Sequence, residues 1–159
     1  MFRSKTLLTA AAVAMATLTT PAVADDLATV QAFYTDILTA PGDTTPEMVR
    51  DVVAEDWVTT PASLGGPGAE GLVNSMAAFG QIVPDLTWEA VEIIEAGDRY
   101  IVRGRATGTP VAPFLGIDPP TGNSFEITSI DIHRVEDGRI VDSYHVEDWA
   151  TAIHQLHGE

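Results

Sequence analysis

Ionisable side chains gather around one short turn near the C-terminal end of the chain. The segment SIDIHRVEDGRIVDSYHVEDW, residues 129 to 149, contains Asp131, His133, His145, Glu147 and Asp148. It holds two of the four histidines in the sequence. A histidine titrates with a pKa of about 6.5, so at neutral pH it can remove a proton next to a carbonyl group or return one to an enolate oxygen. A neighbouring carboxylate fixes the imidazole tautomer and stabilises the imidazolium, so the segment predicts general acid–base chemistry.

Metal binding and nucleophilic catalysis are the competing interpretations of these residues. His133, His145 and Glu147 can in principle supply three metal ligands, but no His-x-x-x-His pair or other spacing that requires a metal occurs. A Gly-x-Ser-x-Gly elbow is also missing. The sequence has no cysteine, which excludes a thiolate nucleophile, a thiolate metal site and a disulfide. We therefore expect no metal and no cofactor in the site.

The turn between the two histidines determines which side chains can meet. We expect Glu136, Asp137 and Gly138 to form a three-residue turn with Gly138 in a left-handed bulge, so that Val135 pairs with Arg139. This register puts Asp131, His133, Ser143, His145 and Glu147 on one face of the hairpin and Ile130, Ile132, Ile140, Tyr144 and Val146 on the other. A two-residue Asp137-Gly138 turn would shift the register by one residue and mix polar and apolar side chains on both faces. The polar stripe is either a solvated sheet face or the lining of a cavity.

Apolar residues recur at helical spacing in the first half of the chain. The first predicted helix, residues 26 to 39, carries Leu27, Val30, Phe33, Ile37 and Leu38. A second begins at the cap Thr45, with Pro46 in its first turn and Val49, Val52 and Val53 on one face. A third carries Leu72, Met76, Phe79 and Ile82 and ends before Pro84. We expect these stripes to form the core.

From Leu86 onward the pattern changes to strands. LTWEAVEIIEA and RYIVRGRATGT flank one turn, and TGNSFEITSIDIHRV and RIVDSYHVE flank the next. A loop rich in Pro and Gly separates the two pairs, and DWATAIHQLH predicts a short final helix. Helices followed by antiparallel strands indicate an α+β domain in which a curved sheet wraps over the helices. Such a wrap leaves a cone-shaped cavity, which is a natural site for a small molecule.

The N-terminal residues are typical of a secretory signal peptide. Met1 to Lys5 carries two positive charges, Thr6 to Leu18 is an uncharged run rich in Ala and Leu, and a small-x-small site ends at Ala24. We expect a signal peptide over residues 1 to 24, a secreted or periplasmic protein, and one domain over residues 25 to 159. A membrane anchor is the alternative, but the apolar run is short for a bilayer and contains several threonines.

The charge balance limits the class of partner. The chain has 23 acidic residues against 8 basic ones, and its only lysine, Lys5, lies in the predicted signal peptide. An acidic surface repels phosphate backbones and anionic lipids. We therefore expect no nucleic acid partner and, after signal cleavage, no membrane partner.

Five segments form a series along the chain: GAEGLVNSMAAFGQIVPDL, GDRYIVRGRATGT, FLGIDPPTG, IDIHRVEDGRIVDSYHVEDW and the terminal HQL. In this order they resemble the SnoaL-like polyketide cyclase or ester cyclase family of the nuclear-transport-factor-like superfamily. The resemblance covers almost all of residues 25 to 159. It implies a cone-shaped α+β fold, cofactor-free aldol ring closure by acid–base chemistry, and a homodimer formed through the open sheet face.

The resemblance also implies a catalytic pair. Family members usually set a His and an Asp facing each other across the last two strands, and Asp131 and His145 fall at these places with the residue types exchanged. Two other positions depart from the family. Thr60 stands where a His often precedes a proline, and Pro110 stands where Gly-Thr-His is common. We expect these departures to change the substrate, because fold transfers more safely than function.

Further side chains are expected to contact a small apolar carbonyl compound in the cavity. These are His133, Glu147, Tyr144, Trp57, Trp88, Phe114 and Trp149. His133 also lies beside the turn, where exposure is the default, and Arg103 is expected to be a structural ion-pair partner. Two functions remain open: an enzyme, and a non-catalytic carrier or sensor that uses the same cavity. Substrate turnover separates them.

Overall fold

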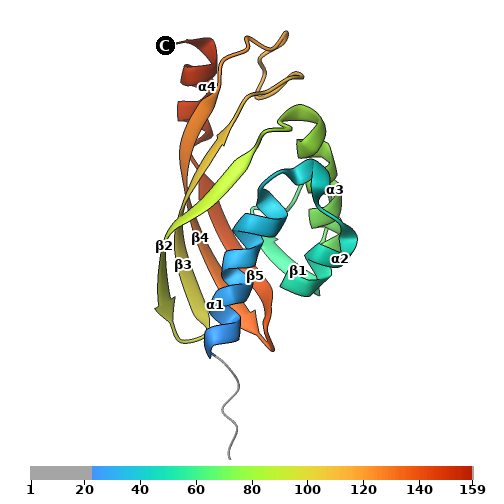
Figure 1. Ribbon diagram of the computed structural model, residues 1–159, viewed down its shortest axis with the longest axis vertical. Coiled ribbons are helices and arrows are strands. Elements are labelled where there is room, and N and C mark those ends of the chain that lie inside the picture. The colour runs from blue at the N-terminus through green and yellow to red at the C-terminus, as the bar shows by residue number, and fades with distance from the viewer. Residues whose placement is uncertain (1–22, 159) are drawn as a thin grey trace, which may run out of the picture.

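A computed structural model of the chain describes residues 23–158, in which most of the helices precede four consecutive strands and one helix ends the chain (Figure 1). The helical elements are α1 (Val23–Ala32), the π-helical η1 (Phe33–Leu38), the 3-10 helix η2 (Pro41–Asp43), α2 (Pro46–Val52), α3 (Gly68–Ile82) and α4 (Trp149–His157). The predicted cap of α2 is confirmed, because the Thr45 side chain accepts a hydrogen bond from the backbone N–H of Met48 at 3.2 Å. Residues 1–22 of the predicted signal peptide lie outside the described residues.

Five strands form one curved sheet in the order β1-β5-β4-β3-β2. They are β1 (Val53–Thr60), β2 (Thr87–Ala96), β3 (Arg99–Gly108), β4 (Phe125–Glu136) and β5 (Arg139–Glu147). Strands β2 to β5 are antiparallel neighbours, as predicted. The α+β class and the curved sheet are therefore confirmed, with α1 crossing one face of the sheet (Figure 1).

Strand β1 corrects the predicted end of the second helix. The helical spacing of Val49, Val52 and Val53 predicts Val53 on that helix, whereas α2 ends at Val52 and Val53 begins β1. This strand pairs in parallel with β5, so the sheet is mixed and not purely antiparallel. Only Val53 and Trp57 are buried along β1, so the strand lacks the period-two alternation by which a strand is recognised in a sequence.

The β4–β5 hairpin corrects the predicted turn but keeps the predicted polar face. Glu136 pairs with Arg139, so the turn has two residues, Asp137 and Gly138, with φ values of 50° and 73°. Positive φ at both positions is the type I′ geometry that Asp-Gly favours. Further along, Arg134 pairs with Asp142 and Val135 with Ile140, which leaves Val141 as an extra residue in a bulge. The bulge shifts the register by one residue.

The consequence of this bulge is that the two faces stay separate. Asp131 pairs with His145 and His133 with Ser143, so these side chains share the inner face, as predicted. Ile140 is the exception, because the bulge turns it inward and it is fully buried, whereas the prediction placed it on the other face. The extra residue of a β-bulge shifts the alternation of side chains by one position, so residues before and after the bulge follow opposite patterns. Here this shift returns the polar residues of β5 to the inner face.

The helices cover the inner face and leave the outer face open. Helix α1 contacts β4 and β5, and α3 contacts β1. On the outer face, Ile94, Ile101, Ile132 and Tyr144 pair in turn across four strands and form an apolar row. Ile94 and Tyr144 are about half exposed, at 54% and 49%.

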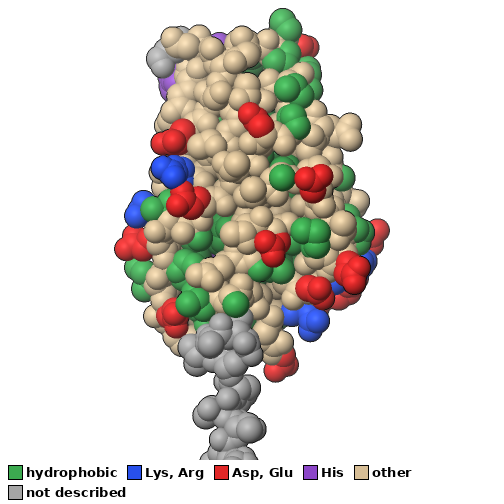
Figure 2. Space-filling model, in the orientation of Figure 1, with side chains coloured by type: hydrophobic (Ala, Val, Ile, Leu, Met, Phe, Trp, Pro, Cys, Tyr) green, Lys and Arg blue, Asp and Glu red, His purple; other side chains and the backbone are tan. Residues whose placement is uncertain are grey.

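Acidic side chains are spread over the surface seen in Figure 2, with arginines beside some of them. Arg103 pairs with Glu92 at 3.1 Å on the outer face, which confirms its expected structural role. Among the described residues, no helix has both the length and the apolar character needed to cross a membrane.

Candidate active site

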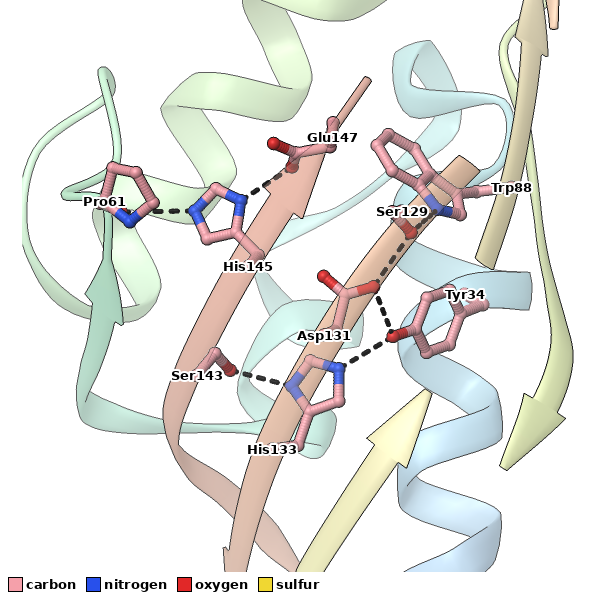
Figure 3. A network of polar contacts seen from close by, with 9 residues as sticks. All are labelled: Tyr34, Pro61, Trp88, Ser129, Asp131, His133, Ser143, His145 and Glu147. Carbon is pink, nitrogen blue, oxygen red and sulfur yellow. Dashed lines mark hydrogen bonds and ion pairs between the residues drawn. The ribbon is translucent and has the colours of Figure 1, made fainter. Parts of the chain in front are cut away.

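The two predicted catalytic residues lie opposite each other on the inner face of the sheet. Asp131 on β4 is the direct cross-strand partner of His145 on β5 (Figure 3). The two side chains are not hydrogen-bonded to each other, because each one bonds to other residues. Asp131 and His145 therefore act as two separately held groups on one surface.

Asp131 is held by two hydroxyl groups on a single oxygen. Its Oδ2 accepts hydrogen bonds from Tyr34 of η1 at 3.0 Å and from Ser129 at 2.9 Å. The Ser129 hydroxyl itself accepts a bond from the Trp88 indole N–H at 3.1 Å. Burial raises the pKa of Asp131 to about 6, although the bonds from Ser129 and Tyr34 oppose this rise. The group is therefore mostly ionised at neutral pH and close enough to its pKa to exchange a proton.

The second carboxylate oxygen, Oδ1, has no hydrogen bond from any described residue. Figure 3 shows it pointing away from Tyr34 and Ser129, toward the side on which His145 and Glu147 lie. A carboxylate with one oxygen fixed and one oxygen open is arranged to accept a proton at the open oxygen.

The His145 ring contacts Glu147 and the backbone of Pro61, the residue directly after β1. Its Nδ1 lies 2.6 Å from Glu147 Oε1, and its Nε2 lies 3.2 Å from the backbone oxygen of Pro61. A carboxylate and a carbonyl oxygen only accept, so the imidazolium, with a hydrogen on each ring nitrogen, is the form of His145 that makes both hydrogen bonds. The hydrogen bond that His145 donates to Glu147 is the largest of the effects that raise the pKa of His145 above its usual range. Glu147 is thus the carboxylate that fixes the orientation of the His145 ring.

His133 is buried, which corrects the expected exposure beside the turn, and its exposed fraction is only 1%. Its Nε2 lies 2.8 Å from the Tyr34 hydroxyl and its Nδ1 lies 2.8 Å from Ser143 Oγ, which also accepts a bond from Trp57 at 3.0 Å. Burial lowers the pKa of His133 to about 3, so its ring is neutral. Because both nitrogens are occupied, His133 reaches the site through Tyr34 and not by direct contact.

The predicted aromatic walls divide into three groups. Trp57 and Trp88 are buried and turn their N–H groups inward to serines. Phe114 and Trp149 pack edge to face at 5.7 Å between ring centroids, and Trp149 packs on Trp88 at 6.4 Å. Tyr144 lies on the outer face and is half exposed, so its predicted place in the cavity is wrong. Its odd spacing from His145 already puts it on the opposite side of the strand.

A hollow of about 620 Å³ opens between α1, η1 and the start of β2. Tyr34 and Trp88 line it, and their polar atoms bond inward to Asp131 and Ser129. Asp131 and His145 are not part of its lining. The His145 side chain is itself 29% exposed and that of Glu147 is 16% exposed, so the imidazolium can be reached from solvent.

Sequence reasoning missed Tyr34. It lies four residues after Val30, on the buried side of the first helix, where a tyrosine normally seeks a partner for its hydroxyl. That rule indicates a polar partner but does not name Asp131. Within the described residues, no group of three or more histidine or carboxylate side chains is arranged to hold a metal ion.

Comparison with known proteins places this geometry in a family. The chain resembles IdmH, a candidate polyketide cyclase from Streptomyces antibioticus, with 30% identity and a TM-score of 0.69 over 83% of this chain and 98% of that one. A candidate polyketide cyclase from Bacillus cereus has 26% identity and a TM-score of 0.67, over 84% of this chain and 80% of that one. TsrD from Streptomyces laurentii shares the fold, with 24% identity and a TM-score of 0.74 over 87% of this chain and 98% of that one.

No curated protein matches the chain in sequence. The model of one family, described as SnoaL-like polyketide cyclase, matches residues 28–156, which include every residue of the site described above. Together with the likeness to IdmH, this match covers nearly all of the described chain. The chain therefore belongs to the SnoaL-like polyketide cyclase family.

Proposed function

We propose that the protein is an exported enzyme that closes a carbon ring in a small apolar carbonyl compound by acid–base chemistry, without a cofactor. The observation that carries the proposal is the pair formed by an Asp131 carboxylate with one open oxygen and a His145 imidazolium on the opposite strand. Family membership supports the same chemistry. Thr60 and Pro110 stand where family members often have histidine, which supports a substrate different from that of those members.

The proposed reaction is an intramolecular aldol addition. Asp131 Oδ1 removes a proton from a carbon next to a carbonyl group, and the electron pair of that C–H bond forms an enolate. The enolate carbon then bonds to a second carbonyl carbon of the same molecule, whose π electrons move to its oxygen. That oxygen takes a proton from His145. Solvent returns the two groups to their starting states, so no oxidant or other reactant is needed.

The two ends of the His145 ring have different roles in this scheme. Nδ1–H is anchored to Glu147 at 2.6 Å, and the carboxylate keeps that proton in place. Nε2–H donates to the Pro61 carbonyl at the longer distance of 3.2 Å. We therefore assign Nε2–H as the proton given to the substrate oxygen, which replaces the Pro61 carbonyl as the acceptor.

The test begins with a screen of small β-dicarbonyl and polyaromatic compounds for binding, followed by NMR detection of hydrogen–deuterium exchange at carbon and of ring closure. His145→Ala and Asp131→Asn should each lower turnover about 10²- to 10⁴-fold, as expected for a positioned acid or base. The double variant should lose less than the product of the two, because both groups serve one reaction. His157→Ala, at an exposed histidine of α4, is the matched control.

Two outcomes would contradict the proposal. Turnover that survives both substitutions would remove Asp131 and His145 from the chemistry. Tight binding by the wild-type protein with no exchange or cyclisation of any bound compound would favour a carrier or sensor that uses the same fold.

A further inference from the structure

Seven side chains form one continuous line of hydrogen bonds across the inner face of the sheet. In order they are Trp57, Ser143, His133, Tyr34, Asp131, Ser129 and Trp88, with successive distances of 3.0, 2.8, 2.8, 3.0, 2.9 and 3.1 Å. All seven are buried, and Figure 3 shows the line from Ser143 to Trp88. Because a buried polar group left unpaired is costly, the hydrogens along the line must fit together.

The two ends of the line fix the direction of their own hydrogen bonds. An indole N–H can only donate, so Trp57 donates to Ser143 and Trp88 donates to Ser129. Ser129 has one hydroxyl hydrogen, and the Asp131 carboxylate accepts it. The direction in the middle of the line then depends on His133.

The His133 ring is neutral and carries one hydrogen, because burial holds its pKa near 3. With that hydrogen on Nδ1, Nε2 would accept the only hydroxyl hydrogen of Tyr34, and the Tyr34 oxygen would face the Asp131 carboxylate with no hydrogen between them. The hydroxyl hydrogen of Ser143 would lose its acceptor as well. With the hydrogen on Nε2, Ser143 donates to Nδ1, Nε2 donates to Tyr34, and Tyr34 donates to Asp131. Every contact then holds one hydrogen.

We propose that His133 is a positioning residue for Asp131. As the Nε2–H tautomer it occupies the Tyr34 oxygen and thereby directs the Tyr34 hydroxyl to Asp131 Oδ2. Ser129 directs a second hydroxyl to the same oxygen, so Oδ1 is the oxygen that remains for the substrate proton. The use of Oδ1 rests on the proposed function, whereas the direction of the hydrogen bonds does not.

The first test is the tautomer of His133 in the wild-type protein, measured by nitrogen NMR of the ring. We expect Nδ1 without a hydrogen and Nε2 with one, and no titration of the ring between about pH 5 and pH 8, since a neutral buried histidine does not take up a proton there. The Nδ1–H tautomer, or a ring that titrates in this range, would overturn the proposal. This measurement needs no substrate.

The second test is Tyr34→Phe, which removes the hydroxyl that joins His133 to Asp131. The pKa of Asp131 should rise above its wild-type value of about 6, because one of the two hydrogen bonds that favour the carboxylate is gone. Carbon NMR of the labelled carboxyl group measures this change. His133 should also shift toward the Nδ1–H tautomer, because its Nε2–H loses its acceptor while Ser143 has a free lone pair.

Tyr100→Phe is the matched control, because Tyr100 is a buried tyrosine on β3 outside this line of hydrogen bonds. It should leave the Asp131 titration and the His133 tautomer unchanged. If Tyr34→Phe also leaves both unchanged, the positioning role of His133 is wrong, whatever the substrate turns out to be.

A substrate, once found, separates this proposal from the proposed function. Tyr34→Phe should then move the acidic limb of the kcat/KM profile to higher pH, with a loss of roughly fivefold at pH 6 and little change at pH 8, since the hydrogen bond that it removes is made to a charged group. If the NMR results are as expected but this limb does not move, the hydrogen-bond line stands and the assignment of Asp131 as the base is wrong.

Discussion

The pKa values of Asp131 and His145 define a range of pH in which both side chains are charged. Burial raises the pKa of Asp131 to about 6, and Glu147 raises that of His145. The carboxylate therefore forms above about pH 6, and the imidazolium persists until the pH passes the raised pKa of His145. A reaction that needs both forms has a bell-shaped dependence on pH between these two limits.

Glu147→Gln should move both limbs of this profile to lower pH. The neutral amide no longer raises the pKa of His145, so the alkaline limb falls; it also no longer repels the Asp131 carboxylate, so the acidic limb falls too. The pH dependence of kcat/KM, with an NMR titration of His145, measures both. Glu92→Gln removes an acidic partner of Arg103 on the outer face and should leave the profile in place. Limbs that move in opposite directions would contradict this account of the charges.

The alternation of polar residues is enough to place Asp131, His145 and Glu147 on one face, because strand geometry depends on local spacing. It is not enough to predict their partners. His133 lies close to a turn in the sequence, and its burial arises from the packing of η1 against β4. This packing places the ring centroids of Phe33 and His133 5.0 Å apart. Such a contact joins segments about a hundred residues apart, and a single sequence gives no signal for it.

At the scale of elements, the β4–β5 hairpin shows how a correct face can follow from an incorrect turn. The prediction keeps the polar residues together by placing an extra residue at the turn itself. The chain instead uses the two-residue turn that Asp-Gly favours and inserts its extra residue at Val141. Both solutions add one residue to the hairpin, so the residues beyond the bulge keep the predicted face, whereas Arg139 and Ile140 change side.

The outer face of the sheet supports a proposal of its own. The apolar row Ile94, Ile101, Ile132 and Tyr144 crosses four strands and is partly exposed, and we propose that it packs against a second copy of the chain. Tyr144→Glu should convert a dimer into a monomer, because each copy would bury one carboxylate in the interface and burying an unpaired charge is costly. Sedimentation equilibrium measures the mass of each form.

Val111→Glu is the control for this substitution, because Val111 is also an exposed apolar residue, at 62%, and lies in the loop after β3, away from the row. It should leave the dimer intact. A wild-type protein that stays monomeric at high concentration, or a dimer that survives Tyr144→Glu, would show that the row has another role.

At the scale of the whole molecule, the charge and the site favour the same kind of ligand. The surface carries an excess of acidic groups, with 23 acidic residues against 8 basic ones in the sequence. Such a surface disfavours anionic polymers, whereas it does not oppose a neutral carbonyl compound. The imidazolium of His145 supplies a positive charge where an enolate or alkoxide would form.

Export is the prediction for the chain as a whole. The protein expressed with its full sequence should be recovered outside the cytoplasm with Asp25 as its first residue, because the charged start, the apolar run and Ala22-Val23-Ala24 together are typical of a cleaved leader. Mass spectrometry of the exported fraction identifies the first residue. Met1 retained in that fraction would contradict the prediction. A chain in which Ala24 is replaced by a bulky residue should be processed poorly.

The bulge at Val141 makes the number of residues on the two sides of the turn unequal, and this difference can be read from the sequence. Five residues separate Asp131 from the Asp-Gly pair of the turn, and six residues separate that pair from His145. A hairpin without the bulge would show equal spacings for residues that face each other. Genomes can thus be searched for the string D-x5-D-G-x6-H. In a chain that keeps the bulge, a second spacing shorter by one residue would put the histidine at the position of Tyr144, on the outer face of the sheet.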